Sequence, residues 1–166
     1  TSTRWVNGIT HYNFKFIDED ILGKAYETYL AEVRKEQGIY YTPPYITKYI
    51  SENTVGNIFD EKISKFKELL EKKDYEKAKL VLLEIIQIKV LDPACGSGSF
   101  LIKSLRLISK KYQEIELILK EQKEKYNKIK GWDHQHPQEF EQIRQVDNLF
   151  KTSSKRELLS KILVRH

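Results

Sequence analysis

A glycine-rich turn follows a short apolar stretch at residues 88–101, which read Ile-Lys-Val-Leu-Asp-Pro-Ala-Cys-Gly-Ser-Gly-Ser-Phe-Leu. The first part, Ile88 to Leu91, suits a buried parallel strand that ends at the acid Asp92. Gly96 and Gly98 can adopt positive φ angles and approach a ligand closely, and a helix after the turn would direct its free N–H groups at that ligand. The pattern therefore predicts a site for a nucleotide-like cofactor.

Two common nucleotide-binding loops do not match this turn. A P-loop requires Gly-Lys-Ser/Thr at the end of the turn, and the dinucleotide fingerprint requires a third glycine where Leu101 stands. The segment Asp92 to Leu101 instead resembles motif I, the S-adenosylmethionine loop of the DNA adenine methyltransferases, whose usual form is Asp-Pro-Ala-Cys-Gly-x-Gly-x-Phe-Leu. The Asp92 carboxylate can accept hydrogen bonds from the cofactor's ammonium group, and the glycine amides can meet its nucleoside and methionine portions. The alternative is a turn that only packs the strand on the helix.

A second motif lies upstream at residues 37–46, which read Gln-Gly-Ile-Tyr-Tyr-Thr-Pro-Pro-Tyr-Ile. Thr42 is a natural N-cap and Pro43 suits the first helical position, so a helix is predicted to start there. Its apolar face would comprise Ile46, Tyr49 and Ile50. The segment resembles motif X of the same family, and in γ-ordered members this Tyr-Thr-Pro turn folds over the cofactor and contacts its methionyl end. The resemblance implies a binding role for Thr42, and a simple helix cap is the alternative.

The two motifs together assign cofactor-binding residues but no catalytic residue and no metal ligand. The cofactor-binding set is Tyr41, Thr42, Pro43, Asp92, Pro93, Ala94, Cys95, Gly96, Ser97, Gly98 and Phe100. The Thr-Pro-Pro-Tyr run at residues 42–45 is similar to the catalytic Asn/Asp/Ser-Pro-Pro-Tyr/Phe motif of amino-methyltransferases. We reject that assignment for two reasons. Threonine does not match the first position, and only a short helical stretch lies between this run and motif I, where permuted families that place the catalytic motif first have a target-recognition region. The acid of motif II is also absent from the chain.

Apolar residues at helical spacing predict several long helices. The predicted stripes lie at 21–33, 59–70, 78–86 with Asp74 as the start, and 101–119 with an extension to Lys130 and a stop at Gly131. A capping box of Ser154 and Glu157 predicts one more helix, with Leu158, Leu159, Ile162 and Leu163 on one face, and the sequence ends at His166 within it. The first stripe resembles the Leu-Gly-x-x-Tyr-Glu helix that precedes motif X in type I modification subunits and type IIG restriction-methylation enzymes.

The predicted fold class is mainly α, as a fragment of an α/β doubly wound (Rossmann-like) S-adenosylmethionine-dependent methyltransferase with one clear β-strand. Such a sheet needs about six or seven strands, so the chain is expected to be incomplete. We expect an N-terminal helical segment with motif X at 1–58, a helical hairpin insertion at 59–87 and the start of the methyltransferase core at 88–166. Beyond His166 an apolar strand ending in Asp or Glu is expected within about ten residues, unless a partner chain completes the sheet.

Charge and composition add weaker constraints. With 29 Lys and Arg against 24 Asp and Glu, the net charge of +5 is compatible with a DNA partner but does not establish one. The basic run from Lys120 to Lys130 is a solvated helix face or a phosphate contact. Cys95 is the only cysteine, so a reducing cytoplasm is expected. His134 and His136 match no strong zinc pattern, and no transmembrane stretch is visible.

The sequence is thus interpreted as the N-terminal part of a site-specific DNA methyltransferase of a restriction-modification system. The parent enzyme would transfer methyl from S-adenosylmethionine to the exocyclic amine of adenine in double-stranded DNA, and the fragment alone is expected to be inactive. A non-catalytic helical interaction module, or a truncated pseudo-enzyme, is the alternative. The intact Asp92, Gly96 and Gly98 favour the first interpretation.

Overall fold

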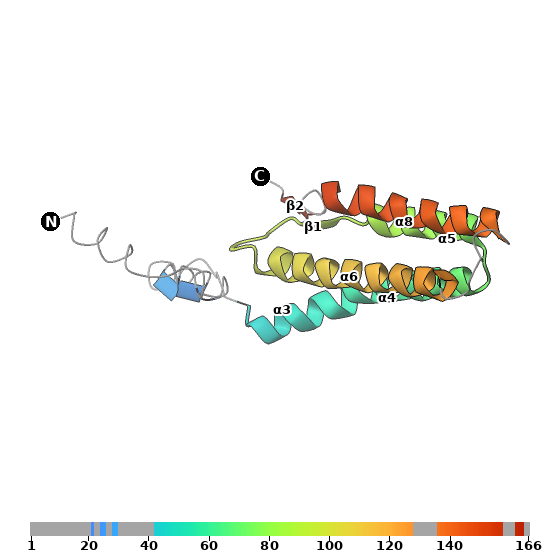
Figure 1. Cartoon of the computed structure of the whole chain (residues 1–166). Coiled ribbons are helices and arrows are strands. Elements are labelled where there is room, and N and C mark those ends of the chain that lie inside the picture. Colours follow the sequence, from blue (N-terminus) through green and yellow to red (C-terminus); the bar gives the residue numbers. More distant parts are fainter. Residues whose placement is uncertain are drawn as a thin grey trace, which may run out of the picture.

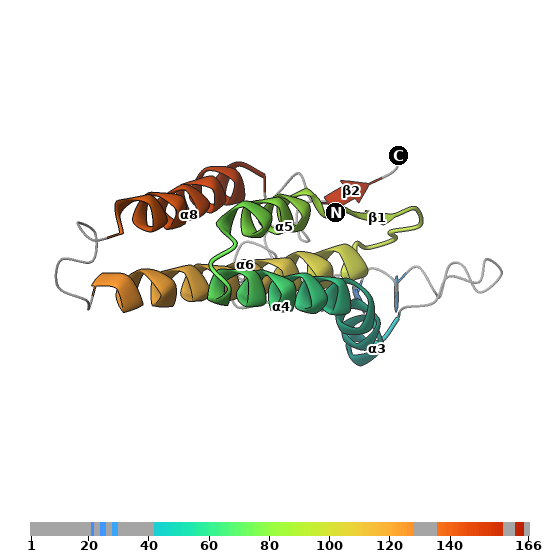
Figure 2. The same ribbon diagram turned by 90° about the vertical axis from the view of Figure 1, so that its right-hand side faces the viewer.

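The computed structural model describes residues 21, 24, 25, 28, 29, 42–127, 136–157 and 162–164. In chain order the elements are α3 (Pro44–Ser51), the π-helix η2 (Glu52–Gly56), α4 (Asn57–Glu71), α5 (Tyr75–Gln87), β1 (Val90–Asp92), α6 (Ser99–Asn127), α8 (Pro137–Glu157) and β2 (Ile162–Val164). Helices α4 and α6 form one layer of a bundle, and α5 and α8 form the other (Figure 1 and Figure 2). The strands lie at one end of this bundle.

The predicted hairpin of α4 and α5 forms, and local signals define its turn. Helix α4 ends in a Schellman motif, in which Lys73 has a φ of 58° and its N–H donates to the Leu70 carbonyl at 3.1 Å. The Asp74 N–H donates to the Leu69 carbonyl at 2.9 Å. The Asp74 carboxylate then accepts from the Lys77 N–H at 3.3 Å, so Asp74 is the N-cap of α5, as predicted.

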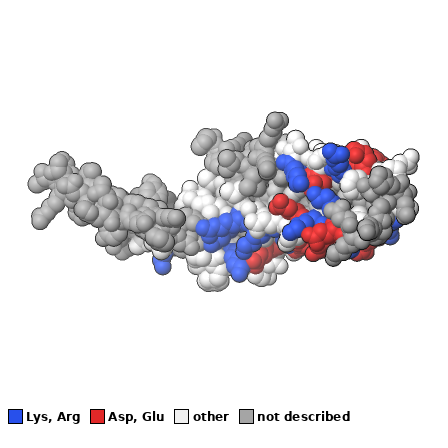
Figure 3. All heavy atoms as spheres, viewed as in Figure 1, with Lys and Arg blue, Asp and Glu red and all other residues white. Residues whose placement is uncertain are grey.

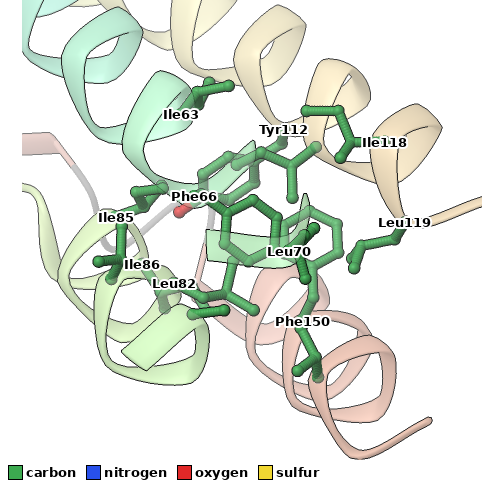
Figure 4. Packing of buried hydrophobic residues seen from close by; sticks show 14 of the residues in the cluster. Ile63, Phe66, Leu70, Leu82, Ile85, Ile86, Tyr112, Ile118, Leu119 and Phe150 are labelled. Atoms are coloured by element: carbon green, nitrogen blue, oxygen red, sulfur yellow. The ribbon is translucent and has the colours of Figure 1, made fainter. Parts of the chain in front are cut away.

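The apolar stripes of the four long helices meet in one core (Figure 4). Tyr112 lies between Phe59 and Phe150, with ring centroids 6.3 Å and 5.7 Å apart. Burial of each large apolar side chain contributes roughly 1.5–3 kcal/mol. The largest fully buried apolar side chains are Phe59, Ile63, Phe66, Leu70, Leu82, Ile85, Ile108, Ile115, Leu119 and Val146. The stripes predicted for α4, α5 and α6 are therefore confirmed.

Helix α8 is absent from the predictions, although its buried residues have helical spacing. Ile143, Val146 and Phe150 face the core, and Phe140 packs against it. The helix predicted to begin at Ser154 is wrong, because the backbone of residues 154–157 forms the last turn of α8. Charged and amide residues surround the few apolar ones, so the stripe is recognisable only against the rest of the core.

The strand prediction needs two corrections. Ile88 caps the end of α5, and β1 begins at Val90 instead of Ile88. The predicted strand forms as β1, but a second strand, β2, runs parallel to it with Ile162 opposite Val90. The expectation of a helix that continues through these residues to His166 is therefore wrong. Pairing with β1 satisfies backbone groups that would otherwise lack partners, which outweighs the helical spacing of a few apolar residues. The chain therefore already returns to the sheet at Ile162.

Helix α3 begins one residue later than predicted and buries a different face. Pro43 is the N-cap, with a ψ of 145°, because a residue that precedes a proline is disfavoured in the helical conformation. Thr42 is therefore not the cap. The buried residues of α3 are Thr47 and Ser51, whereas Tyr49 of the predicted apolar face is 67% exposed. Small polar side chains thus make the contact of α3 with α6.

In the predicted helix at 21–33, the described residues are Ile21, Lys24, Ala25, Thr28 and Tyr29, which are helical and exposed. The remainder of that stripe, and the predicted stop at Gly131, lie outside the described residues. Across the described part of the chain, no helix has both the length and the apolar character required to cross a bilayer.

Candidate functional site

The loop between β1 and α6 is the turn in which the sequence predicts a cofactor site. It leaves the carboxyl end of β1 at Asp92 and enters α6 at Ser99. A hydrogen bond from the Gly98 N–H to the Cys95 carbonyl closes the turn at 2.7 Å, and the Ile102 N–H donates to the Gly98 carbonyl at 2.9 Å. The first N–H groups of a helix have no carbonyl partner within it, so α6 can direct them at a ligand in front of the loop.

Two glycines determine the shape of this loop. Gly96 has a φ of 52° and Gly98 a φ of 81°, which confirms the predicted positive angles. Side chains with a Cβ rarely adopt this left-handed region. A Cβ built at Gly98 would meet no heavy atom within 4 Å, so the space beside this residue is open. The need for glycine at this position is therefore conformational, and the open space is available to a ligand.

The Asp92 carboxylate lies at the mouth of the turn. Its Oδ1 accepts a hydrogen bond from the Ala94 N–H at 3.0 Å, which holds the side chain against the loop backbone. Its Oδ2 has no partner among the residues that the structure describes. A carboxylate oxygen placed in this way can accept a charge-assisted hydrogen bond from an ammonium group. The donor set and the open side of the glycine turn therefore fit an amino-acid-bearing nucleoside.

The loop is accessible along its whole length. None of the residues from Asp92 to Phe100 is buried. The exposed ones are Pro93, Ala94 and Gly96, and the half-buried ones are Asp92, Cys95, Ser97, Gly98, Ser99 and Phe100. The hydroxyls of Ser97 and Ser99 are hydrogen-bonded at 3.0 Å. Leu101 and Ser104, which are 5% and 3% exposed, anchor the start of α6 to the body of the protein.

The upstream motif reaches the same end of the molecule. Thr42 and Pro43 are half-buried and directly precede α3. Helix α3 packs against α6, which is the helix that follows the cofactor loop. Both ribbon views place the start of α3 and the loop at one end of the bundle (Figure 1 and Figure 2). Tyr41 lies outside the described residues. The fold thus brings two motifs that are about 50 residues apart in sequence to one end of the protein.

The sequence analysis also singled out Cys95, two histidines and the basic run of α6. The Cys95 Sγ lies 3.9 Å from the carbonyl oxygen of the neighbouring Gly96. His136 Nδ1 is 3.9 Å from Glu139 Oε1, His134 lies outside the described residues, and no metal-binding cluster of three side chains occurs within the described ones. In the basic run of α6, Lys123 Nζ donates to the Asp147 carboxylate at 2.7 Å and so ties α6 to α8.

A groove between α3 and α6 is the feature that the sequence analysis missed. Lys103, Arg106 and Lys110 of α6 line it together with Lys48 of α3. Arg106 and Lys110 follow Lys103 by three and seven residues, so the three side chains lie on one face of α6. That spacing is a usable signal, but the contribution of Lys48 depends on the packing of α3 against α6.

A comparison with known protein families covers both motifs. The sequence model described as N-6 DNA Methylase matches residues 17–137. Two proteins of Methanocaldococcus jannaschii are similar to this chain: a candidate type II restriction enzyme and methyltransferase, 33% identical over 140 residues, and the methylase subunit of the type I restriction enzyme MjaVIII, 33% identical over 104 residues. The matches cover 69% and 61% of this chain but only 12% and 13% of those relatives. No solved structure matches. Because the family match spans most of the sequence and includes both motifs, the chain belongs to the N-6 DNA methylase family.

Proposed function

We propose that this chain is the cofactor-binding front part of a DNA methyltransferase of a restriction-modification system. The observation that carries the proposal is the loop after β1, in which Gly96 and Gly98 are left-handed and Asp92 presents a carboxylate oxygen beside the start of α6. Members of the family use S-adenosylmethionine, and the names of both relatives identify them as methylating proteins of restriction systems. The proposed reaction is methyl transfer to the exocyclic amine of adenine in double-stranded DNA, in the cytoplasm.

The role of the chain itself is to bind and orient. When bound, S-adenosylmethionine supplies a methyl group on a positively charged sulfur. Asp92 Oδ2 would accept a hydrogen bond from the ammonium group of the cofactor. The backbone N–H groups at Gly96, Gly98 and the start of α6 would face the rest of the ligand. Tyr41, Thr42 and Pro43 would cover the methionyl end. Pro93, Ala94, Cys95, Ser97 and Phe100 complete the proposed set by backbone contact and packing.

The sheet supports the proposal that more protein completes the enzyme. Parallel strands occur almost only in sheets that are covered on both faces, yet Leu91 in β1 is 56% exposed. We propose that further strands, from a longer chain or a partner subunit, pack beside β1 and β2. Those strands would also supply the Asn-Pro-Pro-Tyr/Phe motif that hydrogen-bonds the flipped-out base. We also propose the division of the chain into an N-terminal helical segment at 1–58, a helical hairpin insertion at 59–87 and the start of the methyltransferase core at 88–166.

Calorimetry with S-adenosylmethionine tests the binding role. Weak binding is expected, and Asp92→Asn should reduce the affinity about tenfold, because a charge-assisted hydrogen bond is lost. Asp60→Asn is the matched control, since it removes the same charge at an exposed site on α4 that pairs with Lys111. If the original chain does not bind S-adenosylmethionine, or if the two variants lose affinity equally, the result would favour a non-catalytic interaction module.

Methyl transfer tests the catalytic part of the proposal. The chain alone should transfer no radiolabelled methyl group to DNA, because it lacks the motif that orients the amine. The complete parent protein should transfer methyl groups, and hydrolysis of the product should release N6-methyladenine. Release of N4-methylcytosine would contradict the adenine assignment, and turnover by the chain alone would contradict the proposed division of roles.

A further inference from the structure

The groove between α3 and α6 carries a concentration of positive charge. It has a volume of about 240 Å³ and is lined by Lys48, Ser51, Glu52, Lys103, Arg106, Leu107 and Lys110. Four of these residues are cationic and one is anionic. In Figure 3 basic side chains gather over the region where Figure 1 shows the start of α6 above α3. We call this surface the basic groove.

The one acid in the lining of the basic groove makes only a weak contact with one of its cations. Lys48 Nζ lies 3.9 Å from Glu52 Oε1, and the two side chains are 66% and 51% exposed, so this is a weak surface pair. An excess of cations along one groove favours an anionic partner.

A buried hydroxyl in the same wall points to the kind of partner. Ser51 is 4% exposed, and its Oγ has no hydrogen-bond partner among the described residues. A buried hydroxyl without a partner is unfavourable, whereas an oxygen acceptor placed in the groove would satisfy it. Lysine, arginine and serine are the side chains that commonly contact the phosphate oxygens of DNA. Leu107 adds an apolar surface that suits a deoxyribose.

We infer that the basic groove binds a phosphate of the DNA backbone and thereby positions the duplex beside the cofactor loop. The inference rests on the proposed function, which makes DNA the substrate. Lys103 to Lys110 begin four residues after the first residue of α6, so they lie roughly 6–17 Å along the helix axis from the loop. Phosphate contacts of this kind hold a duplex in register but do not read its sequence.

Fluorescence anisotropy with a labelled DNA duplex tests the inference. The variant Lys48→Gln/Lys110→Gln should bind about tenfold more weakly, and the slope of log affinity against log salt concentration should fall by about 2. The matched control is Lys120→Gln/Lys125→Gln, which removes the same charge from the far half of α6 and should change the affinity less than about twofold. Equal losses in the two variants would overturn the inference, because they would reflect net charge alone.

A substitution without charge gives an independent test. Ser51→Ala removes a hydroxyl that has no partner within the described structure, so the melting temperature should not fall. The affinity for DNA should nevertheless decrease about twofold to fivefold, because a hydrogen bond to phosphate is lost. An unchanged DNA affinity would contradict the role of Ser51 in the basic groove.

Two further measurements identify the anion and separate this inference from the proposed function. Inorganic phosphate should compete only weakly with the duplex, and the chain should bind anionic phospholipid vesicles more weakly than DNA. Complete displacement of the duplex by inorganic phosphate, or tighter binding to vesicles than to DNA, would overturn the assignment. The groove variant should bind S-adenosylmethionine as the original chain does. If it does so while its DNA affinity is unchanged, the basic groove assignment fails and the proposed function stands.

Discussion

The helical bundle and the cofactor-loop end are built in opposite ways. In the bundle, Phe66, Leu82 and Ile108 are 0% exposed, and ordinary caps and turns join the helices. At the loop end no residue from Asp92 to Phe100 is buried, and two glycines adopt left-handed angles. Helix α6 belongs to both regions, since it starts at the loop and crosses the core. The comparison indicates that the bundle supplies the stability and holds α6 in place, while the loop end is shaped for a ligand.

The largest expected effect is on the bundle. Phe66→Ala should reduce the free energy of unfolding by about 3–5 kcal/mol, because a fully buried ring leaves a cavity. Chemical denaturation followed by circular dichroism measures this change. Ile58→Ala on the same helix is the control, since Ile58 is 48% exposed and should cost less than about 1 kcal/mol. Similar losses in both variants would mean that the core does not carry the stability.

Gly98→Val should have the opposite effect: it should change the stability of the bundle little but disturb the conformation of the loop. A residue with a Cβ is disfavoured by about 1–2 kcal/mol at a left-handed φ, and a β-branched one more so. The affinity for S-adenosylmethionine should therefore fall at least tenfold in calorimetry.

The matched control for this prediction is Gly56→Ala. A Cβ at Gly56 would lie 3.5 Å from Leu107 Cδ2, which is an ordinary contact, and no left-handed angle is involved. Cofactor affinity should be unchanged in this variant. Binding by Gly98→Val at the original affinity would contradict the assignment of the loop.

Acid should weaken the bundle through Asp147. Burial raises the pKa of the Asp147 carboxyl, but hydrogen bonds from Lys123 and Lys151 outweigh this and hold the pKa below its usual value. Because the folded pKa is lowered, the stabilisation is present above the unfolded pKa of about 4 and is lost as the pH falls through the folded value. Asp147→Asn should therefore lose about 1–2 kcal/mol at pH 7 and less at pH 3.

Urea unfolding at these two pH values measures the effect. Glu84→Gln is the control, because it breaks an exposed pair with Lys62 and should have little effect at either pH. An equal loss for Asp147→Asn at pH 7 and pH 3 would show that the carboxylate charge does not stabilise the contact of α6 with α8.

The smallest expected effect compares two left-handed positions. Lys73 in the hairpin turn has a φ of 58°, and Gly98 in the loop has a φ of 81°. Lys73→Gly should raise the free energy of unfolding by up to about 0.5 kcal/mol, because relief of the backbone outweighs the loss of the partly exposed ion pair with Glu139. Lys72→Gly, at a φ of −76°, should bring no such gain. A loss in Lys73→Gly would show that the ion pair dominates.

The parts of the fold that the sequence predicts are those that depend on local chemistry. The stripes of α4, α5 and α6, the Asp74 cap and the angles of Gly96 and Gly98 follow from spacing and residue type. Helix α8 and strand β2 could not be predicted in this way, since their few apolar residues acquire meaning only from the core and from β1. The face of α3 depends on contact with α6, where small polar residues are buried and the aromatic ones are exposed.

The same difference between local and long-range signals applies to the candidate site. The loop motif lies within ten consecutive residues, so its residue types alone predict its geometry. The basic groove combines Lys48 with residues more than fifty positions further along the chain, so only the packing of α3 against α6 shows it.

The most direct test of the account is an amide NMR titration of the chain with S-adenosylmethionine. Shifts should be confined to Asp92–Phe100, the first turn of α6 and the residues around Thr42, and the amides of the core, such as that of Phe66, should not move. The shifts should saturate and should be absent in Gly98→Val. Shifts that centre on the bundle, or none in the loop at saturating ligand, would contradict the assignment of this loop as the cofactor site.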